Sequence, residues 1–133
     1  MSMLKGVYVL VISVGKDIRV KVGGLGRVIF GKGLYAYVGS AQNSLEKRIE
    51  RHIRKDKQKF WHIDYLFGNE SVKVLKVFQK TAGRPEECKI AKELDARGVS
   101  IMGFGSSDCN CKSHLFRIQD YEFLRKLMHE LKT

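Results

Sequence analysis

Alternating apolar and polar positions predict strands through the N-terminal part of the chain. In residues 6–14, GVYVLVISV, both alternating faces are apolar, which is typical of a central strand. Shorter alternating runs follow at residues 18–22, 27–30 and 34–39, separated by glycine-rich turns. The pattern therefore predicts that the N-terminal half of the chain forms an antiparallel sheet.

Helical periodicity begins after this region. Leu45, Ile49 and Ile53 recur on one face, and Asn43 or Ser44 precedes them as a capping residue. Together they predict an amphipathic helix that presents this apolar face to the sheet.

The C-terminal half mixes the two periodicities. Residues 60–68 predict a short helix, residues 72–78 a strand, and Pro85 opens a helix that ends near Gly98. From Asp120 onward the apolar spacing predicts a last amphipathic helix. We therefore expect an α+β fold, a small, mainly antiparallel sheet flanked by helices, in a single domain over residues 1–133.

The charge of the chain narrows the choice of partner. Its 133 residues carry 25 Lys and Arg against 14 Asp and Glu, a formal net charge of +11. This excess favours a polyanionic partner, DNA or RNA before an anionic membrane surface. We find neither a signal peptide nor an apolar run near the ~18 residues that cross a bilayer, so we expect a cytoplasmic protein that does not span a membrane.

The densest basic stretch lies between residues 47 and 59, with seven Lys or Arg against two acids and with Phe60 and Trp61 directly after it. Basic side chains there are candidates for phosphate contacts, and an exposed aromatic side chain is a candidate for stacking on an unpaired base. The alternatives are a solvated basic face and a Trp61 buried in the core. The candidate nucleic-acid-binding residues are Lys47, Arg51, Arg54, Lys55, Lys57 and Lys59.

The triplets GVY at 6–8 and YVG at 37–39, followed by Arg48 on a helix, resemble the GIY-YIG nuclease superfamily. The strings RHIRK, WHIDYL and GFGSSDCNCKSHLF are similar to its small stand-alone Uri-type endonuclease-like branch. The resemblance covers nearly the whole chain. One departure is the long insert between the triplets, KDIRVKVGGLGRVIFGKGL, where many relatives have a shorter link.

The resemblance implies that Tyr8 and Tyr37 activate or orient the water that attacks a phosphodiester. The alternative is a pair of core tyrosines with satisfied hydroxyl groups. At helical spacing Arg48, Arg51, His52 and Lys55 share one face, where Arg48 is suited to grip phosphate oxygens with two parallel hydrogen bonds. We expect His52 to assist proton transfer or to contact the nucleic-acid backbone.

A metal-binding carboxylate is expected on the helix after Pro85. Glu87 falls on the extension of the inward stripe, whereas Glu86 and Glu93 lie toward its margin or outside it. A carboxylate on a core-facing stripe needs a partner, and a divalent ion is one. We therefore choose Glu87 as the ligand of Mg²⁺ or Mn²⁺, with Glu86 as the second choice.

The cysteines allow a different metal. Cys109, Cys111 and His114, with Cys88 as the fourth ligand, would make a tetrahedral Zn²⁺ site, although Cys-x-Cys spacing is less typical than Cys-x-x-Cys. The alternative is reduced cysteines packed in a turn.

Three functions remain open on the sequence. The first is a metal-dependent endonuclease acting on nucleic acid, on DNA in preference to RNA, which fits DNA repair. The second is a non-catalytic nucleic-acid-binding module on the same fold. The third is a zinc-stabilised protein-interaction domain.

Overall fold

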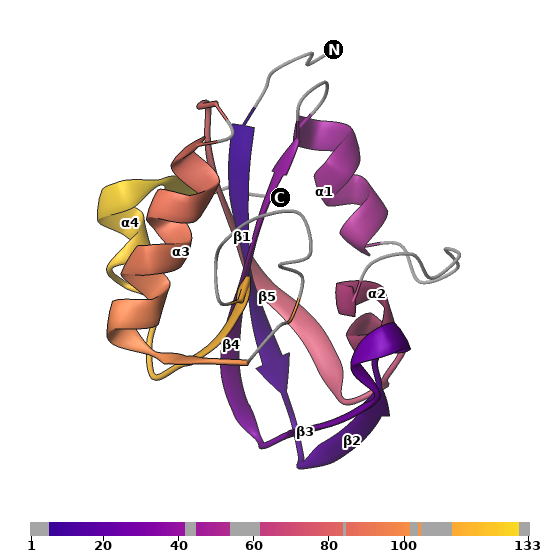
Figure 1. Ribbon diagram of the computed structural model, residues 1–133. Helices are drawn as coiled ribbons and strands as arrows, with labels where there is room; N and C mark the ends of the chain where they lie inside the picture. The colour runs from indigo at the N-terminus through magenta and orange to yellow at the C-terminus, as the bar shows by residue number, and fades with distance from the viewer. Residues whose placement is uncertain are drawn as a thin grey trace.

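The fold is described from a computed structural model of the chain (Figure 1), which describes residues 6–41, 45–53, 62–83, 85–101, 104 and 113–130. Its elements in chain order are β1 (Gly6–Val14), β2 (Ile18–Lys21), the 3-10 helix η1 (Gly23–Leu25), β3 (Arg27–Phe30), β4 (Gly33–Ala41), α1 (Leu45–Ile53), α2 (His62–Phe67), β5 (Val72–Lys80), α3 (Pro85–Arg97), β6 (Val99–Ser100), β7 (Leu115–Ile118), α4 (Leu124–Leu127) and β8 (His129–Glu130).

The main sheet has six strands in the order β6-β7-β4-β1-β5-β8, and every neighbouring pair in it is antiparallel. This confirms the predicted α+β fold with a mainly antiparallel sheet and flanking helices. β1 is central, as its two apolar faces predicted, because it pairs with both β4 and β5. However, β2 and β3 form a separate two-stranded sheet, so the N-terminal strands do not make one continuous sheet.

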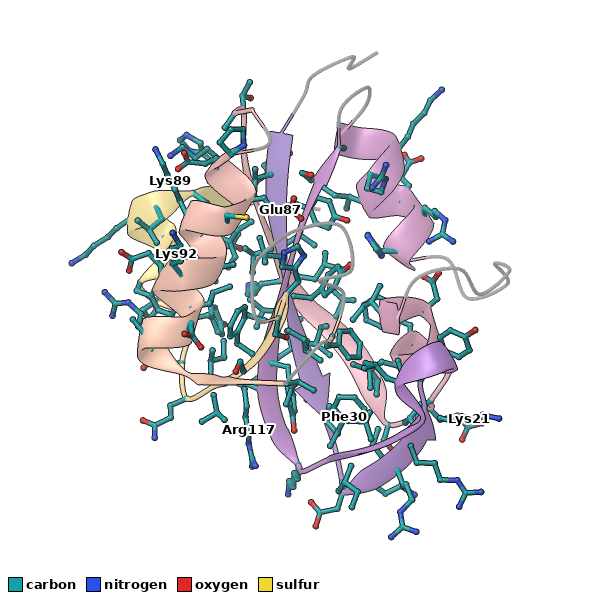
Figure 2. The ribbon with its side chains drawn as sticks, viewed as in Figure 1. Lys21, Phe30, Glu87, Lys89, Lys92 and Arg117 are labelled. Atoms are coloured by element: carbon teal, nitrogen blue, oxygen red, sulfur yellow. The ribbon has the colours of Figure 1, made fainter. Side chains whose placement is uncertain are left out.

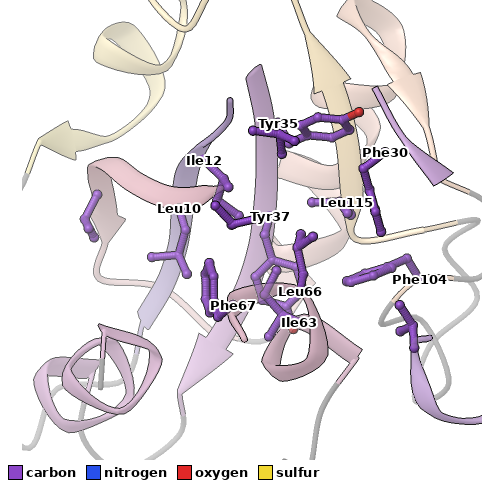
Figure 3. Packing of buried hydrophobic residues seen from close by; sticks show 14 of the residues in the cluster. Leu10, Ile12, Phe30, Tyr35, Tyr37, Ile63, Leu66, Phe67, Phe104 and Leu115 are labelled. Atoms are coloured by element: carbon purple, nitrogen blue, oxygen red, sulfur yellow. The ribbon is translucent and has the colours of Figure 1, made fainter. Parts of the chain in front are cut away.

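The two faces of the main sheet are covered by different layers. Figure 1 shows α3 and α4 on one side and α1, α2 and the β2-β3 hairpin on the other. Along β1, Val7, Val9 and Val11 join the core cluster with α3 and α4. Tyr8 and Leu10 join the opposite cluster, in which Figure 3 shows Tyr37, Leu66 and Phe104 packed together. The strand alternation thus sends Tyr8 toward α1.

The C-terminal region differs from its prediction. A helix was expected from Asp120 onward, but α4 covers only Leu124–Leu127, and β8 then pairs with the edge of β5. Leu124 and Met128 are buried against α3's layer, so one helical turn satisfies the apolar spacing. The following residues instead pair with backbone groups at the edge of β5 that would otherwise lack a strand partner. Across the part of the chain that the structure describes, no helix has the length and apolar character needed to cross a membrane.

The β1-β4 register explains the glycine of the second triplet. Tyr8 lies directly opposite Gly39, and its ring crosses the backbone there. A Cβ atom at residue 39 would lie 2.4 Å from the Tyr8 hydroxyl oxygen and 2.5 Å from Cζ, far inside contact distance. Only glycine leaves room for the phenol ring to cross β4 at this point.

We therefore predict that Gly39→Ala destabilises the protein by about 1 to 3 kcal/mol, because the methyl group must displace a buried ring. The measurement is urea unfolding of the variant and the wild type. Gly24→Ala is the matched control, because an added Cβ at residue 24 meets nothing within 4 Å. Equal stabilities for the two variants would contradict the close approach at Gly39.

Candidate active site

Several polar side chains meet at the edge of β4 where its pairing with β7 ends. The last paired residues are Tyr37 and Leu115, and the Val38 N–H then donates to the His114 carbonyl at 2.9 Å. Beyond that bond, β4 continues through residues 39–41 paired with β1. Side chains from α1, from α3 and from the segment before β7 approach this edge.

Tyr8 and His52 form the buried part of the site. The Tyr8 hydroxyl group and Nε2 of His52 are joined by a hydrogen bond of 2.6 Å. Each residue is only 1% exposed. Burial raises the pKa of Tyr8, and the nearby Arg48 guanidinium lowers it only in part. The phenol therefore keeps its proton at neutral pH.

Tyr37 lies on the same face of the sheet, two residues before Gly39 on β4. Its ring packs edge to face against His52, with centroids 5.8 Å apart, and against Phe104, with centroids 6.3 Å apart. Burial raises the pKa of Tyr37, and the negative charges of Tyr8, Glu87 and Asp64, when ionised, raise it further. The structure thus brings both predicted tyrosines together around one imidazole.

Arg48 reaches the site from α1. Its Nη1 donates to the Ser40 carbonyl oxygen at 3.0 Å. Its charge lowers the pKa of both Tyr8 and Tyr37, against the larger effect of burial. The arginine is therefore held at the strand edge by Ser40 and acts electrostatically on both phenols.

Glu87 reaches the same edge from the first turn of α3. The Ser40 hydroxyl donates to Oε1 at 3.0 Å, and Nδ1 of His114 lies 3.4 Å from Oε2. Figure 2 shows Glu87 on the side of α3 that faces the sheet, and its side chain is 13% exposed. Ser40 was not singled out from the sequence, yet it contacts Arg48 through its carbonyl and Glu87 through its hydroxyl.

The other two acids considered on α3 are engaged elsewhere. Glu86 forms an ion pair with Lys80 at 2.9 Å, and this hydrogen bond lowers the pKa of Glu86. Glu93 pairs with Arg97 at 3.7 Å on the exposed side of the helix. Among these three carboxylates, the structure therefore brings Glu87 to the tyrosines and the arginine.

Of the two roles expected for His52, contact with the nucleic-acid backbone does not fit the structure, because the imidazole is only 1% exposed. His52 follows the buried Ile49 by three residues, and this helical spacing turns it toward the core. Lys55 lies outside the described residues. The imidazole therefore belongs to the Tyr8 site and is not a surface contact.

Arg51 also has a role that the sequence did not indicate. Its two terminal nitrogens donate to the two carboxylate oxygens of Asp64, each at 3.1 Å. Asp64 is buried, at 2% exposed, so this paired hydrogen bond neutralises a charge in the interior and ties α1 to α2. Of the other predicted nucleic-acid contacts, Lys47 is exposed on α1. The remaining ones, Arg54, Lys55, Lys57 and Lys59, lie outside the described residues.

The predicted zinc ligands are only partly described. Cys88 lies partly buried on α3, and Nδ1 of His114 lies 3.4 Å from Oε2 of Glu87. Cys109 and Cys111 lie outside the described residues, so the zinc site stays a prediction. Within the described ranges, no three His, Cys, Asp or Glu side chains are grouped as metal ligands.

A hard divalent cation fits the donor atoms that are present. Glu87 offers a partly exposed carboxylate, and the Ser40 hydroxyl oxygen lies beside it. Mg²⁺ commonly takes one or two carboxylates from a protein and completes its shell with water and phosphate oxygens. A site with a single carboxylate is therefore compatible with this ion.

The fold and the site define a class of α+β protein in which a buried Tyr-His pair, an arginine and a carboxylate meet at one strand edge. The chain belongs to the family described as "Domain of unknown function DUF123", whose model matches residues 7–133. The matched range contains every residue of the site just described. No curated protein and no solved structure shows a significant match to the chain.

The Arg51–Asp64 pair gives a prediction about stability. Arg51→Gln leaves the buried Asp64 carboxylate without its bidentate partner, so we expect the free energy of unfolding to fall by about 2 to 4 kcal/mol. Lys92→Gln, on the exposed surface of α3, is the control and should change it little. The measurement is urea unfolding of both variants. Equal stabilities would show that the pair with Asp64 does not stabilise the fold and would favour a surface contact as the role of Arg51.

The buried phenols give a prediction about pH. Because the pKa of Tyr8 is raised in the folded state, the unfolded chain ionises first, above about pH 10. Below that pH the contribution of Tyr8 to the free energy of unfolding should not change with pH, and above it the free energy of unfolding should fall as the pH rises. Urea unfolding across this alkaline range should show a shallower decline for Tyr8→Phe than for the wild type. Parallel declines would show that Tyr8 ionises as readily in the folded state as in the unfolded one.

Proposed function

We propose that this protein is a metal-dependent endonuclease of the GIY-YIG type that hydrolyses phosphodiester bonds in nucleic acid, with DNA as the preferred substrate and DNA repair as a fitting process. One observation carries the proposal: Tyr8, Arg48 and Glu87 come from a strand and two helices in different layers, yet they converge at one strand edge. The net charge of +11 supports a polyanionic substrate. The pairing of the two triplets across β1 and β4 supports the GIY-YIG relationship.

In this proposal Tyr8 and His52 move the proton of the attacking water. The phenol is neutral at neutral pH, so it does not act as a preformed phenolate. In the tautomer with Nε2 unprotonated, the phenol donates its proton to His52 as it accepts one from water. The oxygen of that water then forms the new bond to phosphorus, and the P–O bond to the leaving oxygen breaks. The leaving oxygen takes a proton from solvent water, and His52 returns its proton to solvent through Tyr8, so both residues regain their starting states. Tyr37 packs against His52 and orients its ring.

Arg48 stabilises the charge that develops on the phosphate. Its guanidinium is planar and suits two parallel hydrogen bonds to phosphate oxygens. The Ser40 carbonyl oxygen holds one terminal nitrogen in place, so the guanidinium is oriented before substrate binds. In this proposal, a phosphate bound by Arg48 lies next to the water that Tyr8 activates.

Glu87 is the residue that would hold Mg²⁺ or Mn²⁺. His114 and Ser40 contact its two carboxylate oxygens and fix their orientation. When bound, the ion would offset negative charge on the phosphate.

The test is cleavage of duplex, branched and single-stranded DNA and of RNA by the purified protein in the presence and absence of Mg²⁺ or Mn²⁺. We expect cleavage that requires the metal, and we expect Tyr8→Phe, Arg48→Gln and Glu87→Gln each to lower its rate by about 100-fold or more. Glu93→Gln, an acid on the exposed side of the same helix, is the matched control and should cleave like the wild type.

Either of two results would contradict the proposal and favour a different function. If no substrate is cut with either metal, while Tyr8→Phe and Glu87→Gln bind nucleic acid as well as the wild type, the protein is a non-catalytic binding module. If elemental analysis finds about one tightly bound zinc per chain and nucleic-acid binding is insensitive to salt, a zinc-stabilised interaction domain is the better account.

A further inference from the structure

The long insert between the two triplets folds into a hairpin with two contrasting faces. Its inward residues Ile18, Val22 and Phe30 are buried in the same core cluster as Tyr8 and Tyr37. Figure 1 places the β2-β3 hairpin on the same side of the main sheet as α1 and α2. The hairpin is therefore part of the layer that also supplies Arg48.

The outward face of the hairpin is basic with one apolar side chain. In the β2-β3 register, Arg19 lies opposite Ile29 and Lys21 lies opposite Arg27, and all four are exposed. Ile29 is 67% exposed, among the most exposed large apolar residues that the structure describes. Figure 2 shows Lys21 at the outer surface and Phe30 on the inner side. From residue 16 to residue 32 there are five basic residues and one acid.

The cations of this face lack an ion-pair partner among the residues that the structure describes. No described carboxylate pairs with Arg19, Lys21 or Arg27. The one nearby acid, Asp17, accepts a hydrogen bond from the Lys32 backbone N–H at 2.8 Å. Like charges directly opposite one another, as in the Lys21–Arg27 pair, destabilise a two-stranded sheet. A polyanionic ligand would remove this repulsion.

The hairpin is also held firmly at its base. Arg117 of β7 donates from Nη2 to the Lys32 carbonyl oxygen at 2.7 Å, and the Tyr35 hydroxyl donates to the Gly31 carbonyl oxygen at 2.8 Å. The Arg117 guanidinium packs so closely that a Cβ added at Gly31 would lie 3.0 Å from Nη1. The basic face is therefore a fixed platform on the main sheet.

We propose that the outward face of this hairpin binds the major groove of double-stranded DNA whose phosphate backbone also reaches the Tyr8 site; this rests on the proposed function. A two-stranded ribbon fits the major groove of B-form DNA, and Ile29 suits apolar contact with a thymine methyl group. Arg19, Lys21 and Arg27 contact the flanking phosphates. Duplex RNA is disfavoured because its major groove is deep and narrow.

The position of the hairpin sets the length of DNA that the protein contacts. Val14, at the end of β1 that leads into the hairpin, is six residues beyond Tyr8. At about 3.3 Å per strand residue, the hairpin lies about 20 Å from the site, which corresponds to about six base pairs. Substrates should therefore require at least this length of duplex on one side of the cut.

The test compares two variants with the same change in charge. In the hairpin variant Arg19, Lys21 and Arg27 are replaced by Gln, and in the control Lys89, Lys92 and Lys126 of α3 and α4 are replaced by Gln. Binding to a long DNA duplex is measured by fluorescence anisotropy in EDTA at several salt concentrations. We expect at least about a tenfold loss of affinity for the hairpin variant relative to the control, and a salt slope lower by about 2 to 3, because each phosphate contact contributes about 0.9.

Equal losses in the two variants would overturn the proposal, since they would reflect net charge alone. It is also overturned if the hairpin variant loses affinity for duplex RNA, or for vesicles containing phosphatidylserine, as much as for DNA. The melting temperature of the hairpin variant should be unchanged or higher, because the Lys21–Arg27 repulsion is gone. If the melting temperature of the hairpin variant is lower, the single variant Lys21→Gln is tested in its place, with Lys92→Gln as the control. The expected loss of affinity is then proportionally smaller. Equal binding by these two single variants would also overturn the proposal.

This experiment separates the hairpin from the catalytic proposal. Binding in EDTA requires no cleavage, so a wild type that binds through the hairpin but cuts nothing would retain this inference and remove the enzyme function. If the wild type cuts DNA but the hairpin variant binds like its control, the enzyme function is retained and the inference about the hairpin is overturned.

Discussion

The passage of the Tyr8 ring across the backbone of Gly39 is the contact on which the rest of the site depends. The β1-β4 register places the two residues opposite one another, and the missing side chain at Gly39 lets the phenol reach His52 on α1. Because both groups are buried there, the hydrogen bond between them fixes α1 against the sheet. The same position of α1 brings Arg48 to the Ser40 carbonyl. One glycine thus sets the geometry of three functional side chains.

The second constraint is the end of the β4-β7 ladder. Up to this point the sheet lies between the layer of α1 and α2 and the layer of α3 and α4, and the described buried residues form two separate core clusters, one on each face. Past His114, Glu87 from one layer and Arg48 from the other both contact Ser40. A strand edge therefore gives a carboxylate and a guanidinium access to the same point without burying either charge alone in the core. We propose that the basic hairpin, about 20 Å away by strand geometry, binds the substrate, while the residues at the strand edge carry out the chemistry.

Much of the fold was predictable from local pattern, and the contacts between distant segments were not. Two apolar faces on residues 6–14 identified the central strand, because only a strand covered on both sides has that pattern. Alternation in β2 and β3 showed which residues are buried but not against which sheet. The inward stripe of α3 predicted Glu87. Its partner Ser40 is 47 residues away, and the spacing of residues along the chain does not indicate a contact over that separation. The three-residue spacing of His52 from Ile49 already indicated that it points inward, whereas the basic residues beside it favoured a role in binding nucleic acid.

We propose that a divalent ion and a phosphate are held at Glu87 and Ser40, beside Tyr8. The decisive experiment is titration of ¹⁵N-labelled protein with Mn²⁺, because the paramagnetic ion broadens the amide signals of nearby residues. We expect saturable broadening centred on Ser40 and Glu87, extending to Tyr8, and lost in Glu87→Gln but retained in Glu93→Gln. Broadening that is centred elsewhere, or that survives Glu87→Gln unchanged, would contradict it.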